Sequence, residues 1–318
     1  MASSTITVPA QRRQALRRRR RKLSSTGYLF VLPATAFFTV FLLIPIGYTV
    51  YLSTKALRVS GLGIVGRRKE VSVGLSNYVD AVKDPELVHS LLRLVVLGLV
   101  IVPIMLGLAT LFALLLDAPR TRFGNFSRLA IFLPYSVPVI VASLLWGFMY
   151  LPSVSPFRYA AGQLGLPQPQ FFGAHSIFLS VANIAIWGGT GFNMVVLYTN
   201  LRAIPAELFD AARIDGCSEV QVARYVKLSM LRPAVVLTTI FSLIATLQLF
   251  NEPFSLAPLT NVIPTTWVPL MKVYRDAFIN DDIYSAAATS VLLALGTLVL
   301  STVVLRVLNT KTIGGDNS

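Results

Sequence analysis

The chain has 318 residues and a formal net charge of +14, yet only 13% of its residues are charged and 54% are hydrophobic. Soluble globular proteins carry roughly 25% charged residues, so this composition excludes an ordinary soluble enzyme or binding domain. The mean hydropathy of +0.68 indicates an integral membrane protein. Its length is best counted in membrane crossings, which need ~20 apolar residues each.

A basic tail, residues 1–27, precedes the first apolar stretch. Between Arg12 and Lys22 it holds eight Lys or Arg residues and no acidic residue. Next to a membrane span, such a cluster favours the cytoplasmic side and contact with anionic membrane lipid. An arginine run is also typical of nucleic-acid binding, which is the alternative interpretation. We expect no nucleic-acid partner, because the adjoining apolar stretch explains the tail as a topology signal. That stretch is too long for the apolar core of a cleavable signal peptide, so we expect it to remain in the protein.

Six stretches free of Asp, Glu, Lys and Arg are long enough to span a membrane as helices. They are residues 28–54, 94–116, 129–157, 177–201, 233–251 and 283–305. Helices are expected because lipid offers backbone amides no hydrogen-bond partner, and the alternation typical of barrel strands is absent. Prolines inside these stretches predict kinks; examples are Pro45, Pro103, Pro134 and Pro138. We predict an all-α integral membrane protein with six transmembrane helices.

The basic residues also predict the topology of a multi-pass protein of the cell membrane. With six crossings, a cytoplasmic N-terminus places the C-terminus and the loops after the second and fourth spans in the cytoplasm, and these loops are rich in Lys and Arg. The first external loop, residues 55–87, is the exception, because Arg67, Arg68 and Lys69 lie outside in this arrangement.

Several kinds of site are not expected. Cys217 is the only cysteine, and the two histidines, His89 and His175, are far apart in predicted external loops, so we expect no metal site and no catalytic constellation. The stretch GLGIVG at 61–66 matches a dinucleotide-binding pattern but follows a membrane span, and we interpret it as a flexible loop. No P-loop sequence occurs, so the chain binds no ATP of its own, and no cofactor is expected.

A short charged segment separates the fourth and fifth predicted spans. Pro205 suits the first position of a helix, and Glu207 places negative charge at the positive end of the helix dipole. Gly216 suits the left-handed residue that ends a helix. Ser218 and Gln221 form the pattern of a capping box, which predicts a second helix through about residue 228. The segment is therefore predicted to be a cytoplasmic helix-turn-helix.

The first of these helices has an apolar face made mostly of small side chains. Leu208, Ala211 and Ala212 recur at helical spacing. One interpretation is an amphipathic linker that rests on lipid headgroups. The small residues favour the other, close approach by a second protein, because a lipid-facing helix would gain more from bulky side chains.

The run AIPAELFDAARIDGCSEVQVARYVKLSMLRP, residues 203–233, closely resembles the cytoplasmic coupling loop of binding-protein-dependent ABC importer permeases of the sugar-transporting type. The pattern of that loop centres on EAA followed by DG, and the resemblance in layout extends over residues 28–308. This chain departs from the pattern at four positions, which are Asp210, Cys217, Ala223 and Ser229.

The resemblance implies a basic tail (1–27), a six-helix importer domain (28–308) and a cytoplasmic C-terminal tail (309–318). It implies that the coupling loop inserts into separate ABC ATPase subunits, which hydrolyse the ATP and drive alternating access. It also implies an extracellular solute-binding protein, a sugar-like solute, and a second permease, a different chain, that completes the pathway. The implied ATPase-coupling residues are Glu207, Leu208, Asp210, Ala211, Ala212, Asp215 and Gly216.

Two further functions were weighed against an importer permease. An ion-coupled secondary transporter or channel is disfavoured because the six stretches contain no ionisable Asp, Glu, Lys or Arg that could relay protons. Coupling to sodium ions bound by backbone carbonyls needs no ionisable side chain, so this argument does not exclude it. A membrane enzyme is disfavoured because no loop contains a catalytic constellation.

The end of the fifth stretch, LQLFNEPF, combines aromatic, amide and carboxylate side chains of the kinds that bind sugars. The alternative is that these groups only hold helices together. Resemblance favours a substrate pathway, and the sequence leaves the particular sugar or polyol open. The candidate pathway residues are Gln248, Phe250, Asn251, Glu252, Asn193 beside the WGGTGF run, which we interpret as flexible, and Tyr284.

Overall fold

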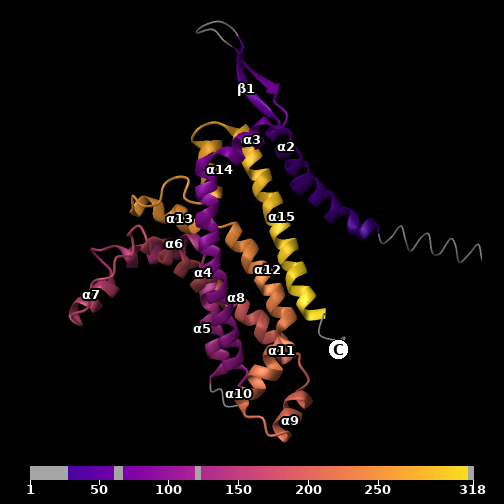
Figure 1. Ribbon diagram of the computed structural model, residues 1–318, viewed down its shortest axis with the longest axis vertical. Coiled ribbons are helices and arrows are strands. Elements are labelled where there is room, and N and C mark those ends of the chain that lie inside the picture. Colours follow the sequence, from indigo (N-terminus) through magenta and orange to yellow (C-terminus); the bar gives the residue numbers. More distant parts are fainter. Residues whose placement is uncertain (1–27, 61–66, 119–122, 314–318) are drawn as a thin grey trace, which may run out of the picture.

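The computed structural model describes residues 28–60, 67–118 and 123–313. It is a helical bundle with a small hairpin at one end, the hairpin end, and a loop of short helices at the other, the α9 end (Figure 1). Within these residues, four helices are long and apolar enough to cross a membrane, or up to six spans if each of two bent helix pairs counts as one. The prediction of a helical membrane protein is confirmed, with four to six candidate spans.

The first candidate span, Tyr28–Ser53, leaves the rest of the bundle (Figure 1). It contains a π-helical turn, η1 (Thr39–Leu43), and continues as α2 (Ile44–Ser53). No residue of its most apolar window is buried inside the chain. Its second half, α2, packs against α15 (Ile283–Ile313), and the Asn77 side chain donates hydrogen bonds to the carbonyls of Ser53 and Lys55 at 2.9 and 2.7 Å.

The segment after this helix is a β-hairpin, which the sequence analysis did not anticipate. Strands β1 (Lys55–Ser60) and β2 (Arg67–Ser72) pair antiparallel, with Lys55 opposite Ser72. A two-stranded ladder leaves its outer edges to hydrogen-bond with water, so it is compatible with a loop outside the lipid. The predicted flexible loop at 61–66 lies outside the described residues.

Helices α4 (Pro85–Leu116) and α8 (Ser176–Arg202) form the centre of the bundle, after the short α3 (Ser76–Lys83). Leu97 and Ile101 of α4 and Ile177 and Val181 of α8 belong to one fully buried cluster. Pro103 lies inside α4 without interrupting it. His89, predicted in a loop, lies in the first turns of α4, because the helix begins nine residues before the charge-free stretch.

At the hairpin end, an ion cluster fastens α14 (Pro269–Phe278) to the start of α4. The buried Lys272 contacts Asp84 at 2.9 Å, and Arg275 contacts Glu86 at 2.6 Å. Burial raises the pKa of the Asp84 carboxyl, but the hydrogen bonds from Lys272 and the Glu86 amide outweigh it and hold that pKa below its usual range.

The third predicted stretch is two helices rather than one. Helices α5 (Gly124–Ser136) and α6 (Val139–Tyr150) meet at 96°. Pro138 has no N–H to continue the helix, and Val137 before it takes extended angles, with ψ at 127°, as the residue before a proline prefers. The kink predicted from Pro134 and Pro138 is therefore a full break. The short α7 (Pro156–Gln163) follows.

The fifth stretch is also interrupted. After α9 (Ala206–Ile214), the chain passes through α10 (Glu219–Gln221), a π-helical turn η2 (Val222–Lys227) and α11 (Leu228–Met230), then bends by 65° into α12 (Arg232–Leu247). Residues 248–250 separate α12 from α13 (Asn251–Leu256), which η3 (Ala257–Leu259) follows. The last helix, α15 (Ile283–Ile313), continues past residue 308, where the C-terminal tail was predicted to begin.

Candidate functional site

The loop at the α9 end has the local structure that its sequence predicts. Glu207 lies in the first turn of α9, although Pro205 caps the helix instead of occupying its first position. Gly216 has a φ of +85°. The Gly216 amide donates to the Arg213 carbonyl and the Cys217 amide to the Ala212 carbonyl, both at 3.0 Å, which is the hydrogen-bond pattern of a glycine-terminated helix.

The predicted capping box is present after this turn. The Ser218 amide donates to the Gln221 side chain at 2.7 Å, and the Gln221 amide donates to the Ser218 hydroxyl at 3.4 Å. The second helix departs from the prediction, because its regular pattern lasts only through α10 before the π-helical turn η2 begins.

Helix α9 offers an exposed surface at the tip of the molecule (Figure 1). None of its residues is buried, and Leu208 and Ile214 are exposed. Arg213 contacts Asp210 of the same helix at 2.8 Å and fastens α9 to α10 by contacting Glu219 at 2.9 Å. A preformed short helix with exposed apolar side chains is suited to insertion into a groove on another protein.

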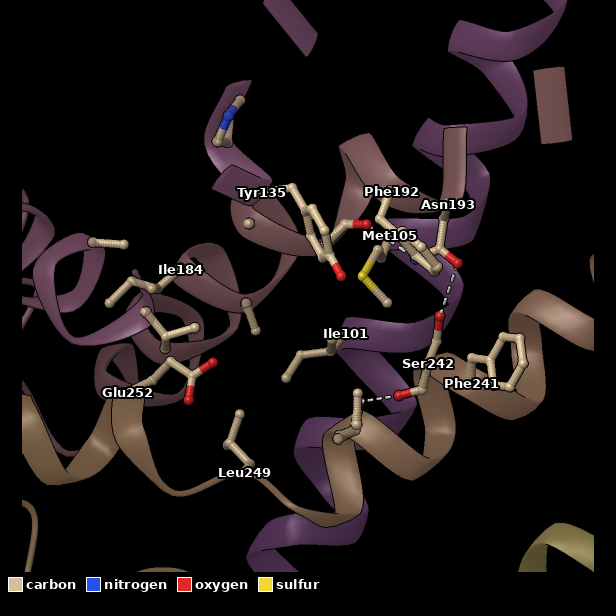
Figure 2. Close-up of a pocket in the computed structure, with 18 of the residues that line it drawn as sticks. Ile101, Met105, Tyr135, Ile184, Phe192, Asn193, Phe241, Ser242, Leu249 and Glu252 are labelled. Carbon is tan, nitrogen blue, oxygen red and sulfur yellow. Dashed lines mark hydrogen bonds between the residues drawn. The ribbon is translucent and has the colours of Figure 1, made fainter. Parts of the chain in front are cut away.

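A cavity of about 300 Å³ lies between α4, the α5–α6 break, α8 and the α12–α13 break (Figure 2). Both breaks line it, through Val137 and Leu249. Non-helical backbone at membrane depth is tolerated where it is buried in protein or faces a cavity. The position of both helix breaks at this cavity agrees with that rule. Figure 2 shows the Tyr135 hydroxyl and the Glu252 carboxylate directed toward the same space.

Asn193 lines this cavity and also joins two helices. Its side-chain amide donates to the Gly189 carbonyl at 3.0 Å, and its Oδ1 accepts a hydrogen bond from the Ser242 hydroxyl of α12 at 3.3 Å. The WGGTGF run beside it is helical and closely packed, so the prediction that it is flexible was wrong. A Cβ on Gly191 would overlap the Ile131 carbonyl oxygen of α5, which explains the need for glycine.

Of the six candidate pathway residues, Asn193 and Glu252 lie at the cavity. Gln248 and Asn251 are exposed beside the α12–α13 break. The Phe250 ring stacks on Phe254, with centroids 4.8 Å apart, and Tyr284 is buried near the start of α15.

The sequence analysis missed three polar residues that line the cavity. Tyr135 sits between the two prolines of the α5–α6 break, and Ser242 and Thr246 are one helical turn apart on α12. The two hydroxyls lie within a stretch that was defined only by its lack of Asp, Glu, Lys and Arg. Their four-residue spacing was the signal that they share a face.

Residues 105–311, more than half of the chain, match the family described as "Binding-protein-dependent transport system inner membrane component". The chain belongs to this family. The permease is thus a multi-pass inner-membrane component of an ABC system, and the ATPase is not this chain. Membership implies an ATPase and a periplasmic binding protein as partners. The ion-coupled transporter and the channel, considered from sequence, are thereby set aside.

Curated relatives include sugar-system permeases. The permease is 30% identical over 270 residues to the lactose transport system permease protein LacF of Rhizobium radiobacter, covering 83% of this chain and 87% of that protein. It is 29% identical to the sn-glycerol-3-phosphate transport system permease protein UgpA of Agrobacterium fabrum strain C58, and the match covers 84% of this chain and 88% of that protein.

The fold also matches a solved structure, that of a bacterial ABC transporter involved in the import of the acidic polysaccharide alginate. The TM-score is 0.78 at 17% sequence identity, and the match covers 92% of this chain and 98% of that one. At this identity the likeness supports the fold alone.

Proposed function

We propose that the permease moves a sugar or sugar-like solute into the cell by alternating access driven by partner ATPase subunits. The observation that carries the proposal is the pairing of an exposed helix α9, suited to an ATPase groove, with a cavity bounded by two helix breaks. The curated relatives for lactose and glycerol phosphate support the class of solute.

The loop 203–233 serves as the coupling element in this proposal. Leu208 is exposed on α9, which suits contact with the partner, and Asp210 holds Arg213, which links α9 to Glu219 of α10. Gly216 sets the turn that presents α9. The coupling residues are Glu207, Leu208, Asp210, Ala211, Ala212, Asp215 and Gly216.

The cavity serves as part of the solute pathway. Glu252 and Asn193 offer a carboxylate and an amide, and Tyr135 and Phe192 offer aromatic surface for the apolar face of a sugar ring. The exposed Gln248 and Asn251 would then face a second, different permease chain across the pathway. Such a partner would also cover the apolar helix Tyr28–Ser53, because none of its most apolar window is buried inside the chain.

The proposed function requires a particular orientation of the permease in the membrane. Both termini and the α9 end face the cytoplasm, where the ATPase works, and the hairpin end faces the binding protein. The basic residues of the 1–27 tail support this orientation.

A stimulation assay tests the class of solute. The complete complex, with its ATPase and binding protein, is supplied with saccharides, polyols, sugar phosphates and amino acids in turn, and ATP hydrolysis is measured. We expect hydrolysis to rise with a saccharide, a polyol or a sugar phosphate. Stimulation by amino acids alone would contradict the proposal.

A further inference from the structure

A buried ion pair lies between the coupling loop and the end of α4. The Lys227 Nζ lies 2.6 Å from Asp117 Oδ2, and the two side chains are only 6% and 5% exposed. Asp117 caps the C-terminus of α4, and Lys227 ends η2. Arg202 at the end of α8 lies farther from the same carboxylate, at 3.8 Å, and is 67% exposed. Lys227 is therefore the close, desolvated partner of Asp117.

The π-helical turn η2 is what turns Lys227 inward. Val222 and Lys227 are its two buried residues, and they are five positions apart. In a regular α-helix, with 3.6 residues per turn, residues five apart do not share a face. Hydrogen bonds that span five residues bring them onto one face. A regular helix in place of η2 would rotate Lys227 away from Asp117 or Val222 away from the core.

Lys227 also contacts the coupling helix itself. Its Nζ lies 5.1 Å from the centroid of the Phe209 ring on α9, within the range of a cation–π interaction. A chain of contacts thus runs from Phe209 of α9 through Lys227 to Asp117 of α4. Nearby, Ala109 and Ala113 of α4 are fully buried with Leu231, so α4 and the segment after η2 are closely packed.

Helix α4 continues from this contact to the cavity. Met105 and Ile101 line the cavity, and Met105 lies twelve residues before Asp117, ~18 Å along a helix rising 1.5 Å per residue. A displacement of α9 that is passed to Asp117 therefore reaches the cavity wall through one rigid element.

Stability alone does not account for a buried pair of this kind. Removing two charges from water costs about as much as their attraction returns, and apolar residues of similar volume often serve a core equally well. A charged pair instead specifies which two groups stay together. We propose that Lys227 is the positioning residue that ties the coupling loop to α4, so that movement of α9 by the ATPase reaches the solute cavity. The inference rests on the proposed function and names how its motion is transmitted.

The test uses the complete complex, with hydrolysis stimulated by solute-loaded binding protein as its main readout. Lys227→Met keeps most of the side-chain volume and removes the charge. We expect normal assembly and basal hydrolysis, with stimulation and uptake lowered about tenfold, within the range of coupling energies between sites. The control Arg202→Met removes the exposed cation near the same carboxylate and is expected to change stimulation by less than about twofold, as surface substitutions do.

Two double variants separate transmission from packing. Charge reversal, Lys227→Asp with Asp117→Lys, is expected to recover part of the stimulation lost in either single variant. The apolar pair Lys227→Met with Asp117→Leu leaves no unpaired buried charge and serves if a single variant fails to assemble; it should assemble and remain poorly stimulated. Full stimulation in Lys227→Met or in the apolar pair would overturn the inference. Absence of stimulation in the unmodified complex would contradict the proposed function itself, which keeps the two failures distinct.

Discussion

Gly216 sets the end of the coupling helix through its backbone alone. Its φ of +85° is in the left-handed region, and a Cβ at this position would meet no atom within 4 Å. Substitution there therefore tests conformation without a steric clash. The residue was identifiable from sequence because the requirement is local to the Asp215–Gly216 turn.

We predict that Gly216→Val abolishes uptake while membrane insertion stays normal. A β-branched residue in the left-handed region costs roughly 1–2 kcal/mol, enough to favour a different turn and to misdirect α9. Uptake and membrane levels are measured together, with Gly216→Asn as the control, because asparagine tolerates this region. Wild-type uptake in the valine variant would show that the turn does not position the coupling helix.

Glu252 places a carboxylate at the cavity. Glu252→Gln keeps the size of the side chain and removes the carboxylate from the cavity. Uptake should fall roughly tenfold with assembly intact, equivalent to ~1.4 kcal/mol, close to the low end for a hydrogen bond to a charged group. Glu70→Gln, on the exposed hairpin, is the control. Unchanged uptake in Glu252→Gln would remove this carboxylate from the pathway.

At the scale of elements, the packing of α8 against α5 depends on close backbone approach. Gly191 meets the backbone of α5 around Ile131 and Phe132, whereas Gly188, on the same helix, has no atom within 4 Å of an added Cβ. The two glycines therefore serve different purposes. Because α5 and α8 both line the cavity, the fit of α8 to α5 contributes to its shape.

We predict that Gly191→Ala lowers the thermal midpoint of the purified complex, because forcing a methyl group into the α5 backbone costs about 1–3 kcal/mol. Gly188→Ala is the matched control. It should be neutral or slightly stabilising, since alanine favours a helix by about 1 kcal/mol over glycine. Equal midpoints for the two variants would mean that α5 and α8 are not in close contact at Gly191.

The elements were predictable where the signal is local. Pro138 marks the α5–α6 break, and Ser218 marks the start of α10. The α12–α13 break has a less direct local signal: residues 248–250 contain neither proline nor glycine, and the nearest proline, Pro253, lies in the first turn of α13, where proline is tolerated. The π-helical turn η2 depends on which side chains find partners across the fold, as Lys227 does with Asp117, 110 residues away. The composition and periodicity of the sequence do not predict such long-range pairs.

For the whole molecule, apolar length predicted a helical membrane protein, because the lipid thickness sets how long an apolar helix must be, and the described residues hold four to six candidate spans. The chain's neighbours in the assembled complex could not be predicted from its sequence in the same way. The helix Tyr28–Ser53 packs against α15 through α2, but no residue of its most apolar window is buried inside the chain, and we expect a neighbour in the membrane to cover it. An isolated permease is therefore expected to be less stable than the assembled complex.

The proposed topology is tested with Cys217, the single cysteine, which is partly exposed in the loop 203–233. A membrane-impermeant thiol reagent added to sealed cells should leave Cys217 unlabelled, because this topology places the α9 end in the cytoplasm. Opening the membrane and denaturing the protein should allow labelling, which serves as the positive control. Rapid labelling in sealed cells would place the loop outside and reverse the orientation.

We propose that ATP hydrolysis by a partner, acting on α9, drives solute through this chain. This is tested by measuring uptake into proteoliposomes that contain the complete complex, with solute-loaded binding protein outside and ATP inside. We predict that uptake requires both ATP and the binding protein and is unaffected when ion gradients are dissipated. Uptake that persists without ATP and follows an imposed ion gradient would contradict the account.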